Sequence, residues 1–170
     1  EGGAIFTFGN VQVTDSYLNN NSSELRSGGA VYIYGTLNIS DSTFTANQSN
    51  LEGGAIYTNN SLTIDNSNIS DNVAGGSGGA ILINGSGASN LAVTNSRFAN
   101  NTSNGGAGGA IFSTGFLTDV RIVNSDFIEN FAASSGDGGG ALFLINTSNF
   151  LVDSSSFQSN STSGYGGAIK

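Results

Sequence analysis

The chain contains no cysteine, histidine, proline, methionine or tryptophan. Without histidine and cysteine, neither a Ser-His-Asp or Cys-His catalytic triad nor a zinc site built on those ligands can form. The absence of cysteine also fits a bacterial secreted protein that has no disulfides. These absences favour a protein that is not an enzyme and that binds no cofactor.

Basic residues are scarce: lysine and arginine total four against twelve aspartates and glutamates, which gives a formal net charge of −8. Binding to nucleic-acid backbones or to anionic membranes needs a cluster of basic side chains. Arg26, Arg97, Arg121 and Lys170 are too far apart in the sequence to form one. No apolar run approaches the roughly 20 residues of a membrane helix. We therefore expect no nucleic-acid partner and no membrane insertion by this segment.

Charged residues are replaced largely by glycine, serine, asparagine and threonine. The composition is still not that of a flexible linker, because 37% of the residues are hydrophobic and these are regularly spaced. A Gly-Gly-Ala triplet recurs in steps of 26, 25, 25, 30, 31 and 27 residues. The triplets begin at Gly2, Gly28, Gly53, Gly78, Gly108, Gly139 and Gly166. An aliphatic residue follows each triplet: Ile5, Val31, Ile56, Ile81, Ile111, Leu142 and Ile169. Such a period indicates a repeat architecture.

A second motif lies between successive triplets. It is anchored on a large apolar residue: Leu18, Phe44, Ile69, Phe98, Phe127 and Phe157. An asparagine stands three residues after each anchor: Asn21, Asn47, Asn72, Asn101, Asn130 and Asn160. A serine stands two residues before it: Ser16, Ser42, Ser67, Ser96, Ser125 and Ser155. Six units that agree at so many columns indicate a solenoid of stacked coils.

Each unit also carries two apolar residues spaced two apart, which is strand spacing and not helix spacing. One unit cannot bury its own apolar face, whereas stacked units place identical columns about 4.8 Å apart. The sequence thus predicts an all-β fold, a right-handed single-stranded parallel β-helix of about six coils of 25–31 residues, in one domain spanning residues 1–170. We expect three short strands per coil. Strict alternation places the aliphatic column inside and the neighbouring alanine and aromatic columns outside. The alternative for a column made only of alanine is a tight interior corner.

The asparagine column is expected to stack amide on amide from coil to coil and to satisfy turn backbone groups. The serine column is expected to form equivalent hydrogen bonds through its hydroxyls at the preceding bend. Ladder asparagines should then be too enclosed to accept a sugar, although several lie in Asn-x-Ser/Thr sequons. Asn38, Asn59, Asn68 and Asn84 are the better candidates for glycosylation.

Two carboxylates share one column: Asp15 and Asp41 occupy equivalent positions on adjacent coils. At about 5 Å apart, the two carboxylates would raise the pKa of one of them or bind a cation between them. The column continues, however, as Asn66, Asn95, Asn124 and Ser154, the pattern of a turn served by short polar side chains. We interpret the column as a turn and keep a cation site at Asp15 and Asp41 as the weaker alternative.

Aromatic residues follow the aliphatic column in most units: Phe6, Tyr32, Tyr57, Phe112 and Phe143. Outward-facing rings would be a stripe for stacking on sugars. The preferred interpretation is a ladder of cross-strand pairs that stabilises the stacked strands.

Gly-Gly-Ala-Ile together with Phe-x-x-Asn resembles the repeat of the chlamydial polymorphic outer membrane proteins and of bacterial parallel β-helix passenger domains. Phe44, Phe98, Phe127 and Phe157 begin intact Phe-x-x-Asn motifs, whereas Leu18 and Ile69 replace the aromatic residue. The resemblance covers essentially the whole chain. It implies a right-handed β-helix displayed outside the cell, and adhesion to host or neighbouring cells.

We therefore expect a non-catalytic extracellular structural or adhesive β-helix of a cell-surface or fibre-forming protein. Its partners would be a host or neighbouring cell surface, a glycan, or other copies of itself stacked end to end. The alternative is a carbohydrate-binding or pectin-lyase-like carbohydrate-active β-helix, although an anionic polyuronate would need more basic partners. Loops at Gly85–Asn90, Thr114–Thr118 and Ala132–Asp137 are where a partner is expected to bind. Neither end resembles a capping repeat, so we expect an excerpt of a longer protein or a stackable unit.

Overall fold

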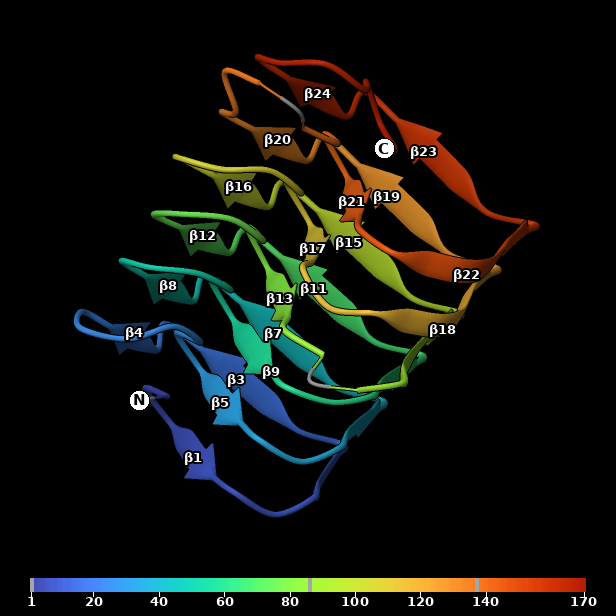
Figure 1. Ribbon diagram of the computed structural model, residues 1–170. Helices are drawn as coiled ribbons and strands as arrows, with labels where there is room; N and C mark the ends of the chain where they lie inside the picture. The colour runs from blue at the N-terminus through green and yellow to red at the C-terminus, as the bar shows by residue number, and fades with distance from the viewer. Residues whose placement is uncertain (1, 86, 137) are drawn as a thin grey trace.

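A computed structural model describes residues 2–85, 87–136 and 138–170, and within these ranges the chain is a parallel β-solenoid of four six-stranded sheets (Figure 1). The first sheet consists of β1 (Ile5–Thr7), β5 (Val31–Ile33), β9 (Ile56–Thr58), β13 (Ile81–Ile83), β17 (Ile111–Ser113) and β21 (Leu142–Leu144). The second consists of β2 (Val11–Thr14), β6 (Leu37–Ser40), β10 (Leu62–Asp65), β14 (Ser89–Thr94), β18 (Leu117–Val123) and β22 (Thr147–Asp153). The third consists of β3 (Tyr17–Asn19), β7 (Thr43–Thr45), β11 (Asn68–Ser70), β15 (Arg97–Ala99), β19 (Asp126–Ile128) and β23 (Ser156–Gln158). The fourth consists of β4 (Ser22–Ser23), β8 (Gln48–Ser49), β12 (Val73–Ala74), β16 (Thr102–Ser103), β20 (Phe131–Ala132) and β24 (Ser161–Thr162).

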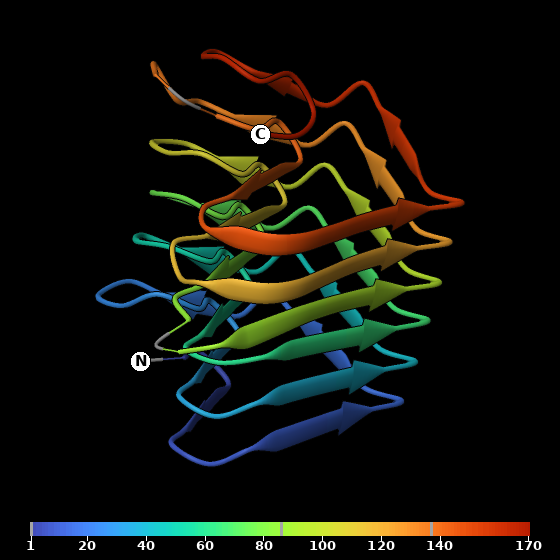
Figure 2. The ribbon, with the colours of Figure 1, turned by 45° about the vertical axis from the view of Figure 1, so that its right-hand side comes forward.

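The predicted all-β parallel β-helix is confirmed. In Figure 2 the long strands of the second sheet run from left to right in front while the chain climbs from its N-terminal coil, which is the sense of a right-handed helix. Within the described ranges, no helix offers a stretch that could span a membrane.

Two details of the prediction are wrong. Each coil has four strands and not three, because the fourth strand is only two residues long and is too short to show alternation in the sequence. The chain returns to the first sheet five times between β1 and β21, so it makes about five complete turns, slightly fewer than the six coils predicted. A parallel bridge between Leu142 and Ile169 begins the next turn.

Strand register places like over like in the inward columns. The fully buried Phe98 and Phe127 are paired in β15 and β19, with ring centroids 4.7 Å apart and planes 6° from parallel. Phe157 continues the stack, 4.8 Å from Phe127. Full burial of one such side chain contributes about 1.5–3 kcal/mol.

The aliphatic column after each alanine lies inside the solenoid. Five of its members are fully buried: Val31, Ile56, Ile81, Ile111 and Leu142. Ile5 in the first coil is half-buried and packs against the same core, as does the anchor Leu18. Phe44 and Ile69, the two anchors between Leu18 and Phe98, are fully buried.

The outward placement of the alanine column is wrong, because Ala30, Ala55, Ala80, Ala110 and Ala141 are fully buried core residues. At this corner successive side chains do not alternate between the inside and the outside of the solenoid. The carbonyl oxygen of each alanine accepts two bonds from the coil before it, as the Ala4 and Ile5 amides both donate to Ala30 O at 2.9 Å. The preceding Gly28 has φ 72°, and a Cβ on Gly29 would overlap the backbone oxygen of Gly54. The Gly-Gly-Ala triplet is therefore a tight interior corner that admits only small residues.

The six repeated asparagines form one continuous ladder. Asn47 donates from its backbone N and from Nδ2 to Asn72 Oδ1, both at 3.0 Å, and its Nδ2 also donates to Leu18 O at 3.0 Å. The same set of bonds recurs at Asn72, Asn101 and Asn130. These four side chains are fully buried, and each amide uses both its donor hydrogens and both acceptor positions.

The repeated serines form a second ladder at the bend between the second and third sheets. Ser42 Oγ donates to Ser40 O at 2.6 Å and accepts from the backbone N of Ser16 at 3.1 Å. Equivalent bonds link Ser67, Ser96, Ser125 and Ser155. The hydroxyls therefore replace the backbone pairing that the bend interrupts.

Replacing Asn101 with alanine should lower the free energy of unfolding by about 2–4 kcal/mol. It removes the acceptor of Asn72 N and Nδ2 and the donor to Ile69 O, and each buried polar group left unpaired costs about 1–3 kcal/mol. Urea unfolding followed by circular dichroism measures the change. The control is Asn104→Ala at an exposed position, expected to cost less than about 0.5 kcal/mol. Equal losses in the two variants would contradict the role of the ladder.

Replacing Gly109 with alanine should destabilise the chain by about 1–3 kcal/mol or more, as overpacking does. The new Cβ would overlap the backbone oxygen of Gly140 and lie 2.6 Å from Phe131 N, so adjacent coils would have to separate. Thermal unfolding compares this variant with Gly87→Ala, whose Cβ would meet no atom within 4 Å. If the melting temperature fell equally in both variants, the spacing between coils would not be what restricts the size of the residue at position 109.

Candidate functional site

In every coil, a residue with a left-handed backbone conformation lies at the end of the second-sheet strand. These residues are Asp15 (φ 47°), Asp41 (φ 50°), Asn66 (φ 44°), Asn95 (φ 50°), Asn124 (φ 49°) and Ser154 (φ 48°). Asparagine and aspartate adopt this conformation more readily than most residues. The turn directs the chain from the second sheet into the third, and the next residue is the inward serine of the ladder.

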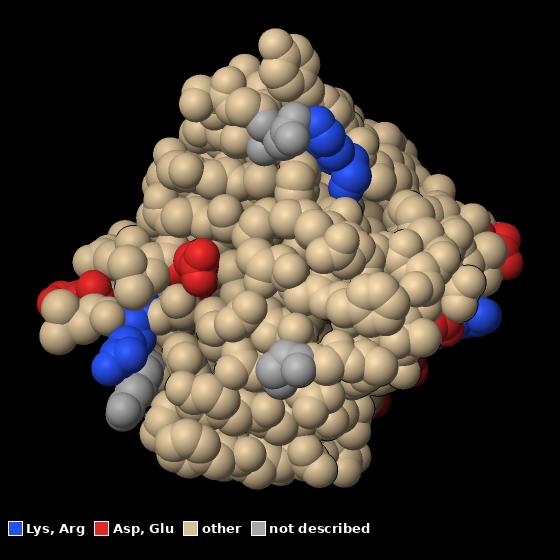
Figure 3. All heavy atoms as spheres, in the orientation of Figure 1, with Lys and Arg blue, Asp and Glu red and all other residues tan. Residues whose placement is uncertain are grey.

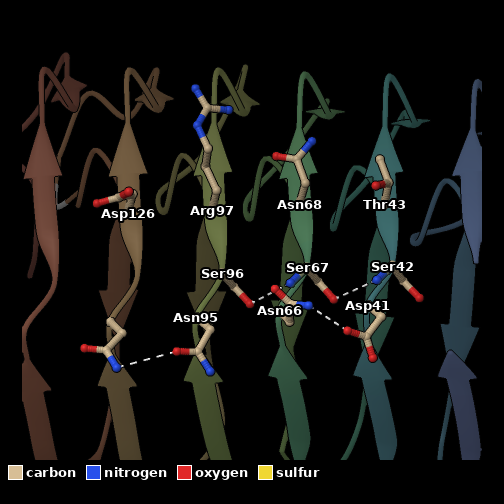
Figure 4. A pocket seen from close by; sticks show the side chains of 11 residues that line it. Asp41, Ser42, Thr43, Asn66, Ser67, Asn68, Asn95, Ser96, Arg97 and Asp126 are labelled. Atoms are coloured by element: carbon tan, nitrogen blue, oxygen red, sulfur yellow. Dashed lines mark hydrogen bonds between the residues drawn. The ribbon is translucent and has the colours of Figure 1, made fainter. Parts of the chain in front are cut away.

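The outer side of this bend is hollowed into a polar groove of about 410 Å³ that spans four coils (Figure 4). Its floor is the serine column, here Ser42, Ser67 and Ser96, whose hydroxyls donate to backbone oxygens of their own coils. One wall is the left-handed column, here called the turn wall: Asp41, Asn66, Asn95 and Asn124. The other, here called the strand wall, is formed by residues that begin the third-sheet strands: Thr43, Asn68, Arg97 and Asp126. Both walls are columns of the solenoid, so the groove runs along its axis.

Side-chain hydrogen bonds hold the turn wall in place. Asn66 Nδ2 donates to Asp41 Oδ1 at 2.6 Å, and Asn124 Nδ2 donates to Asn95 Oδ1 at 3.5 Å. Asn95 Nδ2 donates in turn to Asp65 Oδ1 at 2.9 Å. Each bond crosses from one coil to the next, so the amides of this wall have fixed orientations.

Asp65 stands beside the groove and is the best-bonded carboxylate of this region. Thr94 Oγ1 donates to its Oδ1 at 2.5 Å, alongside Asn95 Nδ2. These hydrogen bonds, that from Thr94 first, hold the pKa of Asp65 below its ordinary value, because they favour the ionised form.

The strand wall has unused hydrogen-bonding capacity. Arg97 and Asp126 face each other in register on β15 and β19, yet among the described residues neither side chain forms an ion pair or a hydrogen bond. Among the residues that the structure describes, Asn68 Oδ1 is enclosed without a hydrogen-bond partner, and Asn68 Nδ2 reaches Ser70 Oγ only at 3.4 Å. Figure 4 shows Arg97 between Asp126 and Asn68, with its guanidinium directed along its strand and away from the turn wall. This wall therefore presents a guanidinium and a carboxylate that the fold does not use.

Asp15 and Asp41, the weaker candidates for a cation site, are both exposed at the left-handed turn. Asp41 has its Oδ1 engaged by the Asn66 amide. In the part of the chain that the structure describes, no three residues of the His, Cys, Asp and Glu types gather where they would hold a metal ion. The arrangement accounts for both aspartates through the conformation of the turn.

The four candidate glycosylation residues lie in different surroundings. Asn38 is exposed on the outer face of β6, whereas Asn59 and Asn68 are half-buried. Asn84 is exposed, and its Nδ2 donates to the Tyr57 hydroxyl at 2.9 Å. Of the ladder asparagines within sequons, Asn47 and Asn101 are fully buried.

The aromatic column faces outward, and neighbouring rings contact one another as the predicted ladder of cross-strand pairs. Tyr32 and Tyr57 stack with centroids 4.5 Å apart and planes 14° from parallel, and Phe8 and Tyr34 stack at 4.8 Å. Phe8 and Tyr34 lie beside the column, and Phe8 is 71% exposed. Within the column, the Phe6–Tyr32 and Phe112–Phe143 pairs are tilted by 50° and 35°. Burial raises the pKa of Tyr57, whose side chain is nearly enclosed.

None of the groove residues comes from the three loops that were expected to bind a partner. Two of those loops, Gly85–Asn90 and Ala132–Asp137, include Ser86 and Asp137, which lie outside the described residues. In the third, Phe116 is half exposed. Sequence reasoning missed the strand wall because its column holds a different residue type in each coil and gives no repeat signal. Figure 3 shows that basic side chains stand apart from one another on the face drawn, without forming a patch.

Residues 41–59 and 154–170 match the family model of the Chlamydia polymorphic membrane protein repeat. Each matched segment contains one Phe-x-x-Asn motif and the Gly-Gly-Ala-Ile that follows it. The resemblance expected from the sequence is therefore confirmed at these two places. Comparisons with the curated proteins and with the solved structures find no significant match. The repeat and the parallel solenoid together fit a surface-displayed, passenger-type β-helix.

Replacing Thr94 with valine should move the pKa of Asp65 upward, toward its ordinary value near 3.9. In the wild-type chain the lowered pKa means that ionised Asp65 stabilises the fold at pH values above that ordinary value, and that this contribution is lost as the pH falls through the folded-state pKa. A carbon-detected NMR titration of the Asp65 carboxyl measures the shift. The control is Thr63→Val, on the exposed face of β10. An unchanged titration in Thr94→Val would contradict the assigned cause.

Proposed function

We propose that the chain is a non-catalytic structural and adhesive module of a cell-surface protein, and that the polar groove is its contact surface. The single observation that carries the proposal is the contrast between the inward and outward columns at one bend. The side chains of the inward serines and asparagines are fully hydrogen-bonded, whereas the side chains of Arg97 and Asp126 on the strand wall form no bond among the described residues.

The residues that stabilise the fold are not the ones that we propose to contact a partner. The inward columns tolerate little change, because their side chains stack in register and are buried. The strand wall carries threonine, asparagine, arginine and aspartate at equivalent positions of four successive coils. These outward positions differ from coil to coil while the inward columns of the rigid scaffold stay alike. A groove of this kind lets contact residues vary without cost to the fold.

The spacing of the groove carboxylates favours binding over hydrolysis. Asp41 precedes β7 and Asp126 begins β19, which lie three strand steps apart in the third sheet. At about 4.8 Å per step, this separation is roughly 14 Å. Glycosidases that cleave with a carboxylate pair hold the two groups no more than about 9.5 Å apart. The two groove carboxylates therefore suit separate contacts to a ligand.

The match to the Chlamydia polymorphic membrane protein repeat supports display at a cell surface. The partner we propose is the surface of a host or neighbouring cell.

Fluorescent microspheres coated with the chain should bind cultured epithelial cells well above albumin-coated microspheres. The matched variant combines Thr43→Ala, Arg97→Ala and Asp126→Ala, which are strand-wall side chains with no hydrogen bond to the core. We expect several-fold fewer bound microspheres for this variant, with circular dichroism unchanged. Flow cytometry counts them.

Binding no greater than that of albumin would overturn the adhesive proposal. Undiminished binding by a folded triple variant would show that adhesion does not use the groove.

A further inference from the structure

We infer that the groove binds a linear, uncharged oligosaccharide that lies along the solenoid axis with about one sugar unit per coil. This inference rests on the proposed function of the same groove and names the class of its ligand. Its basis is the repeat of the two walls, the chemistry of their side chains and their charge.

The walls repeat at the coil spacing, about 4.8 Å. An extended chain of β-linked hexopyranoses advances by a similar distance per unit. Each sugar would therefore meet one residue of the turn wall and one of the strand wall, as Asn66 with Asn68 or Asn95 with Arg97. The groove crosses four coils, so it matches roughly four units.

The side chains match the hydrogen bonding of sugars. A hydroxyl group both donates and accepts, and so does the carboxamide of Asn66, Asn95 or Asn124. Asp126 accepts only, and Arg97 donates only, so the two together take both roles of a hydroxyl pair. The amides of the turn wall are already oriented by their bonds to Asp41, Asn95 and Asp65, which lowers the cost of ordering them on binding.

The polarity of the lining disfavours a peptide. Recognition of an extended peptide uses an open sheet edge and pockets for alternate side chains. The residues that line this groove are all polar, and its floor is the serine column at a bend between paired strands. It therefore offers a peptide neither an edge nor an apolar pocket.

Charge decides between uncharged and anionic glycans. The groove holds two carboxylates, Asp41 and Asp126, against one guanidinium, Arg97. The whole chain carries a formal charge of −8. A glycan with one carboxylate per unit would place negative charges beside Asp41 and Asp126, which costs binding energy.

Titration of the isotope-labelled chain with cellohexaose, chitohexaose and β-1,4-mannohexaose, followed by NMR of the side-chain amides, tests the inference. At least one of the three should produce saturable shifts centred on Asn66, Asn68, Asn95 and Asn124. Hexagalacturonate, of the same length but charged at every unit, should produce none. For the sugar that binds, affinity should rise from the disaccharide to the tetrasaccharide and then level off.

Asn95→Gly removes a groove amide while keeping the left-handed turn, and it should weaken binding about three- to tenfold, as expected for one or two lost neutral hydrogen bonds. Asn100→Gly is the matched control, because Asn100 (φ 55°) is also exposed and left-handed but lies outside the groove. Its affinity should equal that of the wild-type chain.

Failure of all three uncharged hexasaccharides to bind, or tighter binding of hexagalacturonate, would overturn the inference. The microsphere assay separates this from failure of the proposed function. Adhesion that depends on the groove without any oligosaccharide binding would leave the adhesive function standing and exclude this ligand class.

Discussion

The carboxamide ladder is the interaction on which the rest of the structure depends. Each ladder asparagine joins its own turn to the coil before it, through a bond to a backbone oxygen, and to the coil after it, through the next carboxamide. Because these amides are buried, any shift in register would leave several polar groups unpaired at once. The stacked phenylalanines beside the ladder add apolar burial, but they do not by themselves fix which residue lies over which. The ladder therefore sets the register that all four sheets share.

That register is what creates the groove. Left-handed turns recur at the same place in each coil, and the serine ladder draws the intervening residue inward. The residues on either side are left pointing outward as two parallel rows, as Figure 4 shows. A surface feature four coils long thus results from local backbone conformation repeated in register, without any dedicated loop.

Much of the fold was predictable because the residues that define it are invariant from coil to coil. Asn72 could be assigned a place from sequence because its column holds asparagine in every coil, and Phe98 because its column always holds a large apolar residue. Ala80 was placed on the wrong side because strict alternation fails where one carbonyl accepts two amides. Strands such as Ser22–Ser23 are too short to produce a pattern. Arg97 and Asp126 could not be recognised as site residues, because what joins them is their position beside a turn and not a shared residue type.

The hydrogen bonds between coils also have a direction. Backbone amides of a ladder asparagine and a ladder serine donate to side-chain oxygens of the following coil, as Asn47 N does to Asn72 Oδ1 and Ser42 N to Ser67 Oγ. Wherever such a stack is cut between two coils, one cut face presents these donors and the other presents the matching acceptors. The two faces are chemically unlike despite their similar outlines, so only one orientation of a neighbouring coil can restore the bonds. The solenoid therefore has a direction along its axis, and that direction is set by its hydrogen bonds and not by its charges.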